Sequence, residues 1–90
     1  MLFMLLETYR NGDPVPVYQR LRDRGRQATP GLEYRGSWVT TDLKQCFQLM
    51  ECDDRAQLDQ WIALWDDLVE FEVIDVMTSA DAQAAIAPRL

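Results

Sequence analysis

The first six residues of the chain, Met1 to Leu6, are all apolar. A strand that alternates polar and apolar side chains can keep one face in water, but an uninterrupted apolar strand must be covered on both faces. Only two convincing amphipathic helices follow in the sequence, enough to cover one face of a small sheet. A partner subunit is therefore the expected cover for the other face.

Length and composition indicate one folded domain with a thin core. A chain of 90 residues buries only about 60–65% of the surface that its unfolded form exposes. Hydrophobic residues make up 48% of the chain and charged residues 27%, which is typical of a globular domain and excludes a disordered one. The net charge of −6 argues against nucleic acid and anionic membranes as partners, because both bind clustered lysine and arginine.

Turn-forming and capping residues divide the first third of the chain. We expect a strand over residues 2–9, which the turn pair Asn11-Gly12 ends. Asp13 as an N-cap and Pro14 at the first helical position then predict a helix. This helix should extend to about residue 24 or 27.

The middle of the chain predicts a hairpin of two β-rich runs, residues 32–40 and 45–52. The expected register pairs Trp38 with Phe47, Gly36 with Leu49, Val39 with Cys46, Ser37 with Gln48, and Arg35 with Met50. One face is then apolar and carries Leu32, Tyr34, Trp38, Phe47 and Leu49. The other face is mixed and carries Arg35, Ser37, Cys46, Gln48 and Met50.

The last part of the chain predicts a helix, a strand and a short helix. Asp54 and Gln57 resemble a capping box. The apolar stripe that follows, with three- and four-residue spacing, consists of Leu58, Trp61, Ile62, Trp65 and Leu68. A strand is expected over residues 69–77, and Ser79 should cap an alanine-rich helix that ends at Ala87.

The order strand, helix, strand, strand, helix, strand predicts an α+β ferredoxin-like βαββαβ sandwich, one domain over residues 1–90. Right-handed crossovers give a four-stranded antiparallel sheet with both long helices on one face, plus the short C-terminal helix. The first and third strands lie in the centre of such a sheet. Packing of two sheets face to face in a two-fold homodimer is the simplest way to cover the second apolar face.

Several segments together resemble a bacterial family of short proteins classed as a domain of unknown function. They are Met1-Leu2-Phe3-Met4, Gly31-Leu32-Glu33-Tyr34, Ser37-Trp38-Val39, Cys46-Phe47-Gln48-Leu49-Met50-Glu51, Trp65-Asp66-Asp67-Leu68 and Phe71-Glu72-Val73. The resemblance covers nearly the whole chain but supplies no catalytic residues. More distantly, the pattern resembles the dimeric α/β-barrel superfamily, which implies two apposed sheets and a pocket between sheet and helices. Its muconolactone isomerases, cofactor-independent monooxygenases and small stress-response proteins have active-site residues without counterparts here.

The chain has no histidine, which removes Ser-His and Cys-His catalysis and most zinc and iron sites. No cofactor or metal is therefore expected. Cys46 is interpreted as a small buried hydrophobe rather than a nucleophile. Cys52 lies about 20 Å from it along the same expected strand, too far for a disulfide.

The expected ligand-binding residues are Tyr34, Arg35, Trp38, Gln48 and Trp65. On the mixed face, Arg35, Ser37 and Gln48 are suited to orient a small molecule, and the Arg35 guanidinium could grip a carboxylate. The aromatic residues are expected to line a pocket between sheet and helices. The alternative for both groups is structural, as a polar layer at an edge or interface and as core packing.

Asp66 and Asp67 lie near the end of the predicted second helix, where the helix dipole disfavours negative charge. We expect Arg20 and Arg24 of the first helix to hold them in salt bridges. A structural role is favoured over a general acid or base for this pair.

Two function classes stay open. The first is a cytoplasmic, homodimeric, non-catalytic module that binds a small molecule or is associated with stress. An apolar run without a basic leader, interrupted at Glu7 and too short to span a bilayer, supports that location. The second is a cofactor-independent isomerase or monooxygenase for a small aromatic or acidic substrate. The absence of histidine favours the first class, whereas a cavity holding a group with a strongly shifted pKa would favour the second.

Overall fold

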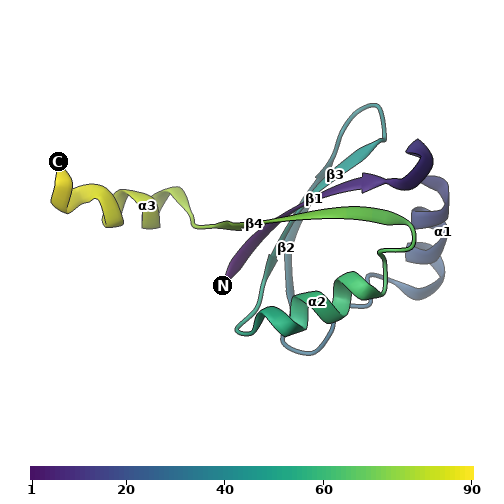
Figure 1. The fold of residues 1–90 in the computed structure, drawn as a ribbon, viewed down its shortest axis with the longest axis horizontal. Helices are drawn as coiled ribbons and strands as arrows, with labels where there is room; N and C mark the ends of the chain where they lie inside the picture. Colours follow the sequence, from purple (N-terminus) through teal and green to yellow (C-terminus); the bar gives the residue numbers. More distant parts are fainter.

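Four antiparallel strands form one sheet in the order β2-β3-β1-β4, and two helices cover one of its faces (Figure 1). The computed structural model describes all residues 1–90. The elements are β1 (Leu2–Tyr9), α1 (Val15–Arg24), β2 (Glu33–Val39), β3 (Gln45–Glu51), α2 (Arg55–Ala63), β4 (Val69–Val76) and α3 (Ser79–Ile86), with 3-10 turns at Arg10–Gly12 and Ala87–Arg89. The βαββαβ order with β1 and β3 in the centre is the ferredoxin-like fold, which confirms the predicted fold class.

The main core lies between the sheet and α2. Phe3 and Leu5 of β1 pack with Met50 of β3, and water reaches almost none of their surface. Leu58 and Trp61 of α2 close this cluster from the other side. Because alternate residues of a strand point to one face, the odd-numbered residues 3 to 9 of β1 all face the helices and are all buried.

The opposite side of the sheet, which we call the open face, is covered by no helix. The strand registers place eight apolar side chains there, from all four strands: Leu2, Met4, Leu6, Trp38, Phe47, Leu49, Ile74 and Val76. Trp38 is 59% exposed and Ile74 is 44% exposed. Because β1 is apolar on both faces, the open face carries a contiguous exposed apolar surface.

A β-bulge in β2 corrects one end of the predicted hairpin register. Gly36 pairs with Leu49 as predicted, but Tyr34 rather than Arg35 pairs with Met50. Since a bulge inserts one extra residue into a strand, side chains beyond it change faces. Tyr34 consequently faces the helices, and its predicted place beside Trp38 is wrong. Leu32, assigned to the same apolar face, is instead buried in the main core.

The helices begin close to the predicted residues, but α2 ends earlier than predicted. In α2 the capping box is present: the Asp54 carboxylate accepts from the Ala56 N–H, and the Gln57 side chain accepts from the Asp54 N–H. The helix stops at Ala63, earlier than the apolar stripe predicts. Two acidic residues follow, Asp66 and Asp67, which the negative end of a longer helix would disfavour.

At the end of β4, α3 projects away from the body of the protein (Figure 1). Thr78 caps this helix in place of the predicted Ser79, because its hydroxyl accepts from the Asp81 N–H at 3.1 Å. Every residue from 77 to 90 is exposed. No helix of the structure combines the length and the apolar character needed to cross a membrane.

Candidate functional site

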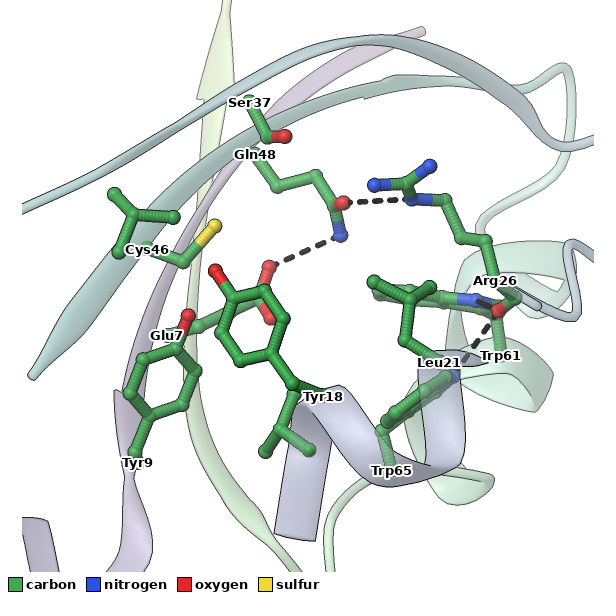
Figure 2. A pocket seen from close by; sticks show the side chains of 12 residues that line it. Glu7, Tyr9, Tyr18, Leu21, Arg26, Ser37, Cys46, Gln48, Trp61 and Trp65 are labelled. Atoms are coloured by element: carbon green, nitrogen blue, oxygen red, sulfur yellow. Dashed lines mark hydrogen bonds between the residues drawn. The ribbon is translucent and has the colours of Figure 1, made fainter. Parts of the chain in front are cut away.

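A cavity of about 190 Å³ lies between α1 and the helix-facing side of the sheet (Figure 2). Strands β1, β2 and β3, both long helices and the segments that follow these helices contribute to its wall. The lining residues are Glu7, Tyr9, Val17, Tyr18, Leu21, Arg26, Ser37, Val39, Cys46, Gln48, Trp61 and Trp65. The wall is mostly apolar with a few polar groups that converge, which is the usual composition of a small-molecule site.

Three polar side chains form a hydrogen-bonded chain along this cavity. Arg26 donates from Nε to Gln48 Oε1 at 3.0 Å, and Gln48 donates from Nε2 to Glu7 Oε2 at 3.0 Å (Figure 2). Arginine has no acceptor atom, so its contact fixes which end of the Gln48 amide faces Glu7. Glu7 is 7% exposed and Gln48 4%. The buried carboxyl group therefore has a neutral amide, and no ion pair, as its partner.

Strand pairing explains why these side chains meet. Glu7 of β1 lies opposite Cys46 of β3, and Leu5 lies opposite Gln48. Residues two apart on a strand share a face, so Glu7 and Gln48 are diagonal neighbours on the helix-facing side. The two central strands thus supply the acid and its hydrogen-bond donor from rigid positions.

Two tryptophans and a tyrosine hold Arg26 at the edge of the cavity. The indole N–H groups of Trp61 and Trp65 both donate to the Arg26 backbone carbonyl, at 2.8 and 3.2 Å. The Arg26 guanidinium stacks on the Tyr34 ring, 3.7 Å from its centroid. Its two terminal amino groups donate to no acceptor of the protein, so they are available to a ligand.

Burial raises the pKa of Glu7 from its ordinary 4.5 to about 7, and the positive charge of Arg26 opposes only part of this shift. At neutral pH both protonation forms of Glu7 are populated. The carboxyl group can therefore accept a proton from a ligand or donate one to it. Shifted carboxyl groups in cavities are typical of functional sites, although structural networks also contain them.

Cys46 also lines the cavity but is a poor nucleophile. Burial, and to a smaller extent the neighbouring Glu7, raises the pKa of its thiol to about 11. The thiol is therefore protonated at neutral pH, in agreement with its interpretation as a small buried hydrophobe. Burial and the adjacent Tyr18 likewise raise the pKa of Tyr9 well above its usual range.

The structure separates the five predicted ligand-binding residues. Gln48 and Trp65 line the cavity, and Tyr34 supports Arg26 one layer behind it. Trp38 lies on the open face, on the opposite side of the sheet. The Arg35 guanidinium forms ion pairs with two carboxylates, those of Glu33 and Glu51, and contributes no wall to the cavity.

Sequence reasoning did not single out Glu7 or Arg26 as site residues. Glu7 was expected only to interrupt the apolar run, and Arg26 was assigned no role. A signal for Glu7 exists in the strand alternation, because position 7 shares a face with Phe3, Leu5 and Tyr9. A single carboxylate on such a buried face is itself a pointer to function. Arg26 lies in the loop after α1, and no local pattern predicts its contact.

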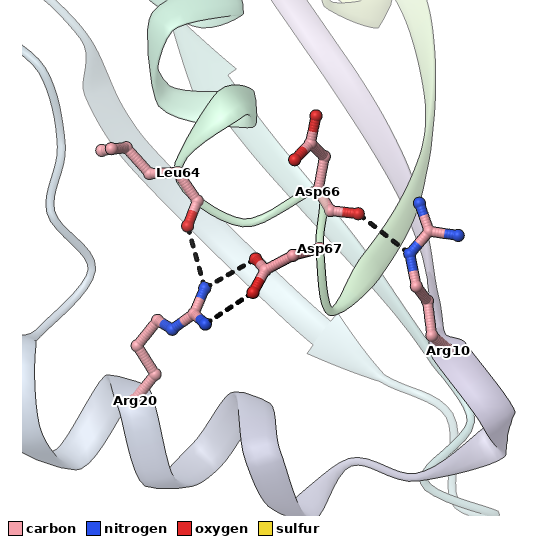
Figure 3. Close-up of polar contacts among 5 residues, drawn as sticks. All are labelled: Arg10, Arg20, Leu64, Asp66 and Asp67. Atoms are coloured by element: carbon pink, nitrogen blue, oxygen red, sulfur yellow. Dashed lines mark hydrogen bonds and ion pairs between the residues drawn. The ribbon is translucent and has the colours of Figure 1, made fainter.

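The expected salt bridges at the end of α2 are half confirmed. Arg20 binds Asp67 through two hydrogen bonds of 2.8 and 2.7 Å, which hold the pKa of that carboxyl below its usual range (Figure 3). The predicted partners Asp66 and Arg24 form no ion pair. Asp66 instead accepts through its backbone carbonyl from Arg10 at 2.9 Å. These exposed contacts join α1 and the turn after β1 to the segment before β4, which is a structural role.

No group of three or more histidine, cysteine, aspartate or glutamate side chains is arranged to hold a metal ion. The model of a family described as a domain of unknown function, DUF3303, matches residues 1–90. None of the curated proteins compared with the chain matches it. Among solved structures, the chain is similar to the crystal structure of protein Atu4242 from Agrobacterium tumefaciens. The two are 15% identical, with a TM-score of 0.47 over 88% of this chain and 96% of that chain.

Proposed function

The chain belongs to the DUF3303 family, a domain of unknown function, and we propose that it is a homodimeric module that binds one small molecule between its sheet and α1. The observation that carries the proposal is the buried chain Arg26, Gln48, Glu7 along an otherwise apolar cavity. A polar chain of this kind costs stability in a core, so a ligand that uses its unpaired atoms is a reason for its presence.

The cavity defines the chemical class of ligand. Its volume of about 190 Å³ exceeds the roughly 150 Å³ cavity that admits benzene, so it suits a single ring or a short chain. Tyr18, Trp61 and Trp65 offer aromatic surface. Glu7 favours a hydroxyl group on the ligand, and the free amino groups of Arg26 favour a carboxylate or carbonyl oxygen. A small aromatic acid with one hydroxyl group meets these requirements.

The partner in the proposal is a second copy of the chain, bound through the open face. Support comes from the eight apolar side chains there, since leaving them in water forgoes about 25 cal/mol for each Å² of apolar surface. A two-fold axis would bring the same face of both subunits together. We place the dimer in the reducing cytoplasm, because Cys46 and Cys52 are both free.

Titration with 4-hydroxybenzoate, followed by the fluorescence of Trp61 and Trp65, tests the binding function. We expect saturable binding with a Kd of about 0.1–1 mM, because the usual binding free energy per non-hydrogen atom gives this affinity for a ligand of this size. Filling the cavity with Val39→Phe should abolish binding at an unchanged fold. Val15→Phe, a matched change at an exposed residue, should leave it intact. If neither this acid nor p-cresol or benzoate binds the wild-type protein, the proposal is wrong.

A second candidate function is a cofactor-independent isomerase for a small aromatic or acidic substrate. One observation favours it: the cavity holds a carboxyl group whose pKa lies near neutrality, as a general acid or base requires.

A further inference from the structure

We propose that Glu7 acts as a general base toward a small aromatic ligand that carries a carbonyl group on a side chain, and that it removes a proton from the side-chain carbon next to that carbonyl group. The inference rests on the proposed binding function and deepens it. A bond forms between a Glu7 oxygen and the proton while the C–H bond breaks, and the electron pair moves to the carbonyl oxygen as an enolate. Where a C=C bond of the ligand adjoins the deprotonated carbon, the enolate is a dienolate, and return of the same proton from Glu7 to its far carbon restores the carbonyl group and gives the isomer with the C=C bond shifted next to it. No oxidant, reductant or second substrate is consumed.

The geometry leaves one Glu7 oxygen free for this step. Oε2 accepts the hydrogen bond from Gln48, whereas Oε1 accepts none from the protein. No buried side-chain oxygen or nitrogen of the structure lacks a hydrogen-bond partner. Oε1 must therefore be accessible, and the accessible space beside Glu7 is the cavity. A base needs such an unshared oxygen within reach of the ligand.

The Arg26 guanidinium lies at the same cavity and supplies the positive charge that would stabilise the enolate oxygen. The terminal amino groups of Arg26 are unpaired, and the guanidinium is fixed by Gln48 and by its stacking on Tyr34. Donors that are already oriented before the charge develops stabilise it at little reorganisation cost. Gln48 is a positioning residue here, because it links the base to the cation and touches neither the proton nor the enolate.

The environment also gives the base a suitable strength. A carboxylate in an apolar cavity loses hydration and becomes a stronger base than one in water. Burial is the larger cause of the shift at Glu7, and Arg26 is the only opposing charge. The base form should accumulate as the pH rises through about 7.

The ring opening of 5-nitrobenzisoxazole is a test that needs no knowledge of the natural ligand. A base removes the ring C–H proton, that electron pair forms the nitrile, and the N–O bond breaks to release a coloured nitrophenolate. The wild-type protein at pH 8 should react at least about 100-fold faster than Glu7→Gln, the usual lower range for a positioned base. The wild-type rate should rise with pH, with a midpoint near 7.

Matched variants separate the base from the fold and from the binding site. Asp53→Asn removes an exposed carboxylate outside the cavity and should leave the rate unchanged. Glu7→Gln keeps the size of the side chain and should still bind 4-hydroxybenzoate within about tenfold. Binding without any Glu7-dependent ring opening would overturn the base while sparing the proposed function. Absence of both would overturn the two proposals together, and a rate that persists in Glu7→Gln would also overturn the base.

Discussion

At the scale of single residues, Glu7 is the position where a carboxyl group is buried among apolar neighbours. Its neighbours on the helix-facing side of β1 are Leu5 and Tyr9, both buried. A shift in pKa from 4.5 to about 7 corresponds to about 3 kcal/mol of differential stability between the two protonation forms. An apolar residue would avoid this cost, which is a reason to propose a functional role for the carboxyl group.

Replacement of Glu7 by glutamine should change how stability depends on pH. Because the native protein holds this proton more tightly than the unfolded chain, Glu7 favours folding most at and below pH 4.5. Its contribution declines as the pH rises to about 7 and is constant above. Relative to Glu7→Gln, the wild-type free energy of unfolding should therefore fall by about 3 kcal/mol between pH 4.5 and 8.

Urea unfolding of both proteins at fixed protein concentration measures that difference. Comparison with the variant is necessary because paired carboxyl groups such as Asp67, whose pKa is lowered, change stability in the opposite direction. They stabilise the fold above their ordinary pKa and lose that effect in acid, equally in both proteins. If the free energies of unfolding of the wild type and Glu7→Gln differ by the same amount at every pH from 4.5 to 8, Glu7 is not desolvated.

The sequence predicted part of the site at this scale. Gln48 and Trp65 line the cavity, as strand parity and helical spacing predict from local order alone, and their ligand-binding role stays a prediction. Trp38 pairs with Phe47 as predicted, but it lies on the open face and not in the cavity. The alternation of side chains along a strand does not determine which face of the sheet the helices cover. Arg35 was misplaced by a bulge. Arg26 could not be predicted, because its contacts join residues 22 to 39 positions apart along the chain.

At the scale of elements, the start of α2 shows how a local signal fixes a boundary. The Asp54 carboxylate accepts a hydrogen bond from the Ala56 N–H at 2.9 Å, and the Gln57 side-chain oxygen accepts one from the Asp54 N–H. The capping box places the helix so that Leu58 and Trp61 enter the core. All four strands and this cap followed from alternation and capping residues, which act over a few positions.

Removal of the cap should have a modest, measurable cost. We expect Asp54→Ala to lower the free energy of unfolding by about 1 kcal/mol, because a helix N–H loses its acceptor. Asp53→Ala is the matched control, since Asp53 is exposed and caps nothing; it should change stability by less than about 0.5 kcal/mol. Equal melting curves for Asp54→Ala and the parent protein would contradict the role of the box.

The end of α2 and the start of β2 were less predictable than the rest of these elements. An apolar stripe to Leu68 indicated a longer helix, yet Trp65 reaches the core from the turn that follows Ala63. A residue can keep its buried place after the helix ends, so periodicity alone does not locate the end. The bulge at Tyr34 leaves no periodic signal, because it is resolved only when β2 pairs with β3.

At the scale of the whole molecule, the two faces of the sheet have different surroundings. One is closed by α1 and α2 around the core and the cavity, and the other remains apolar and uncovered. The order of elements was sufficient to predict the ferredoxin-like topology, because handedness and short connections exclude most alternatives. The order of elements does not determine what covers the open face, and the proposed second copy stays a prediction.

A homodimer through the open face predicts a mass of about twice 10.5 kDa in sedimentation at micromolar concentration. Trp38→Lys would bury a charge in this interface in both subunits. At about 2 kcal/mol for each copy, the dimer Kd should rise about 1000-fold and a 10.5 kDa monomer should appear. Val15→Lys, at an equally exposed residue of α1, should leave the dimer intact. A wild-type protein that sediments as a monomer at 100 micromolar (about the upper end of a useful dimer Kd) would contradict the proposed dimer and leave the Glu7 cavity to be tested on its own.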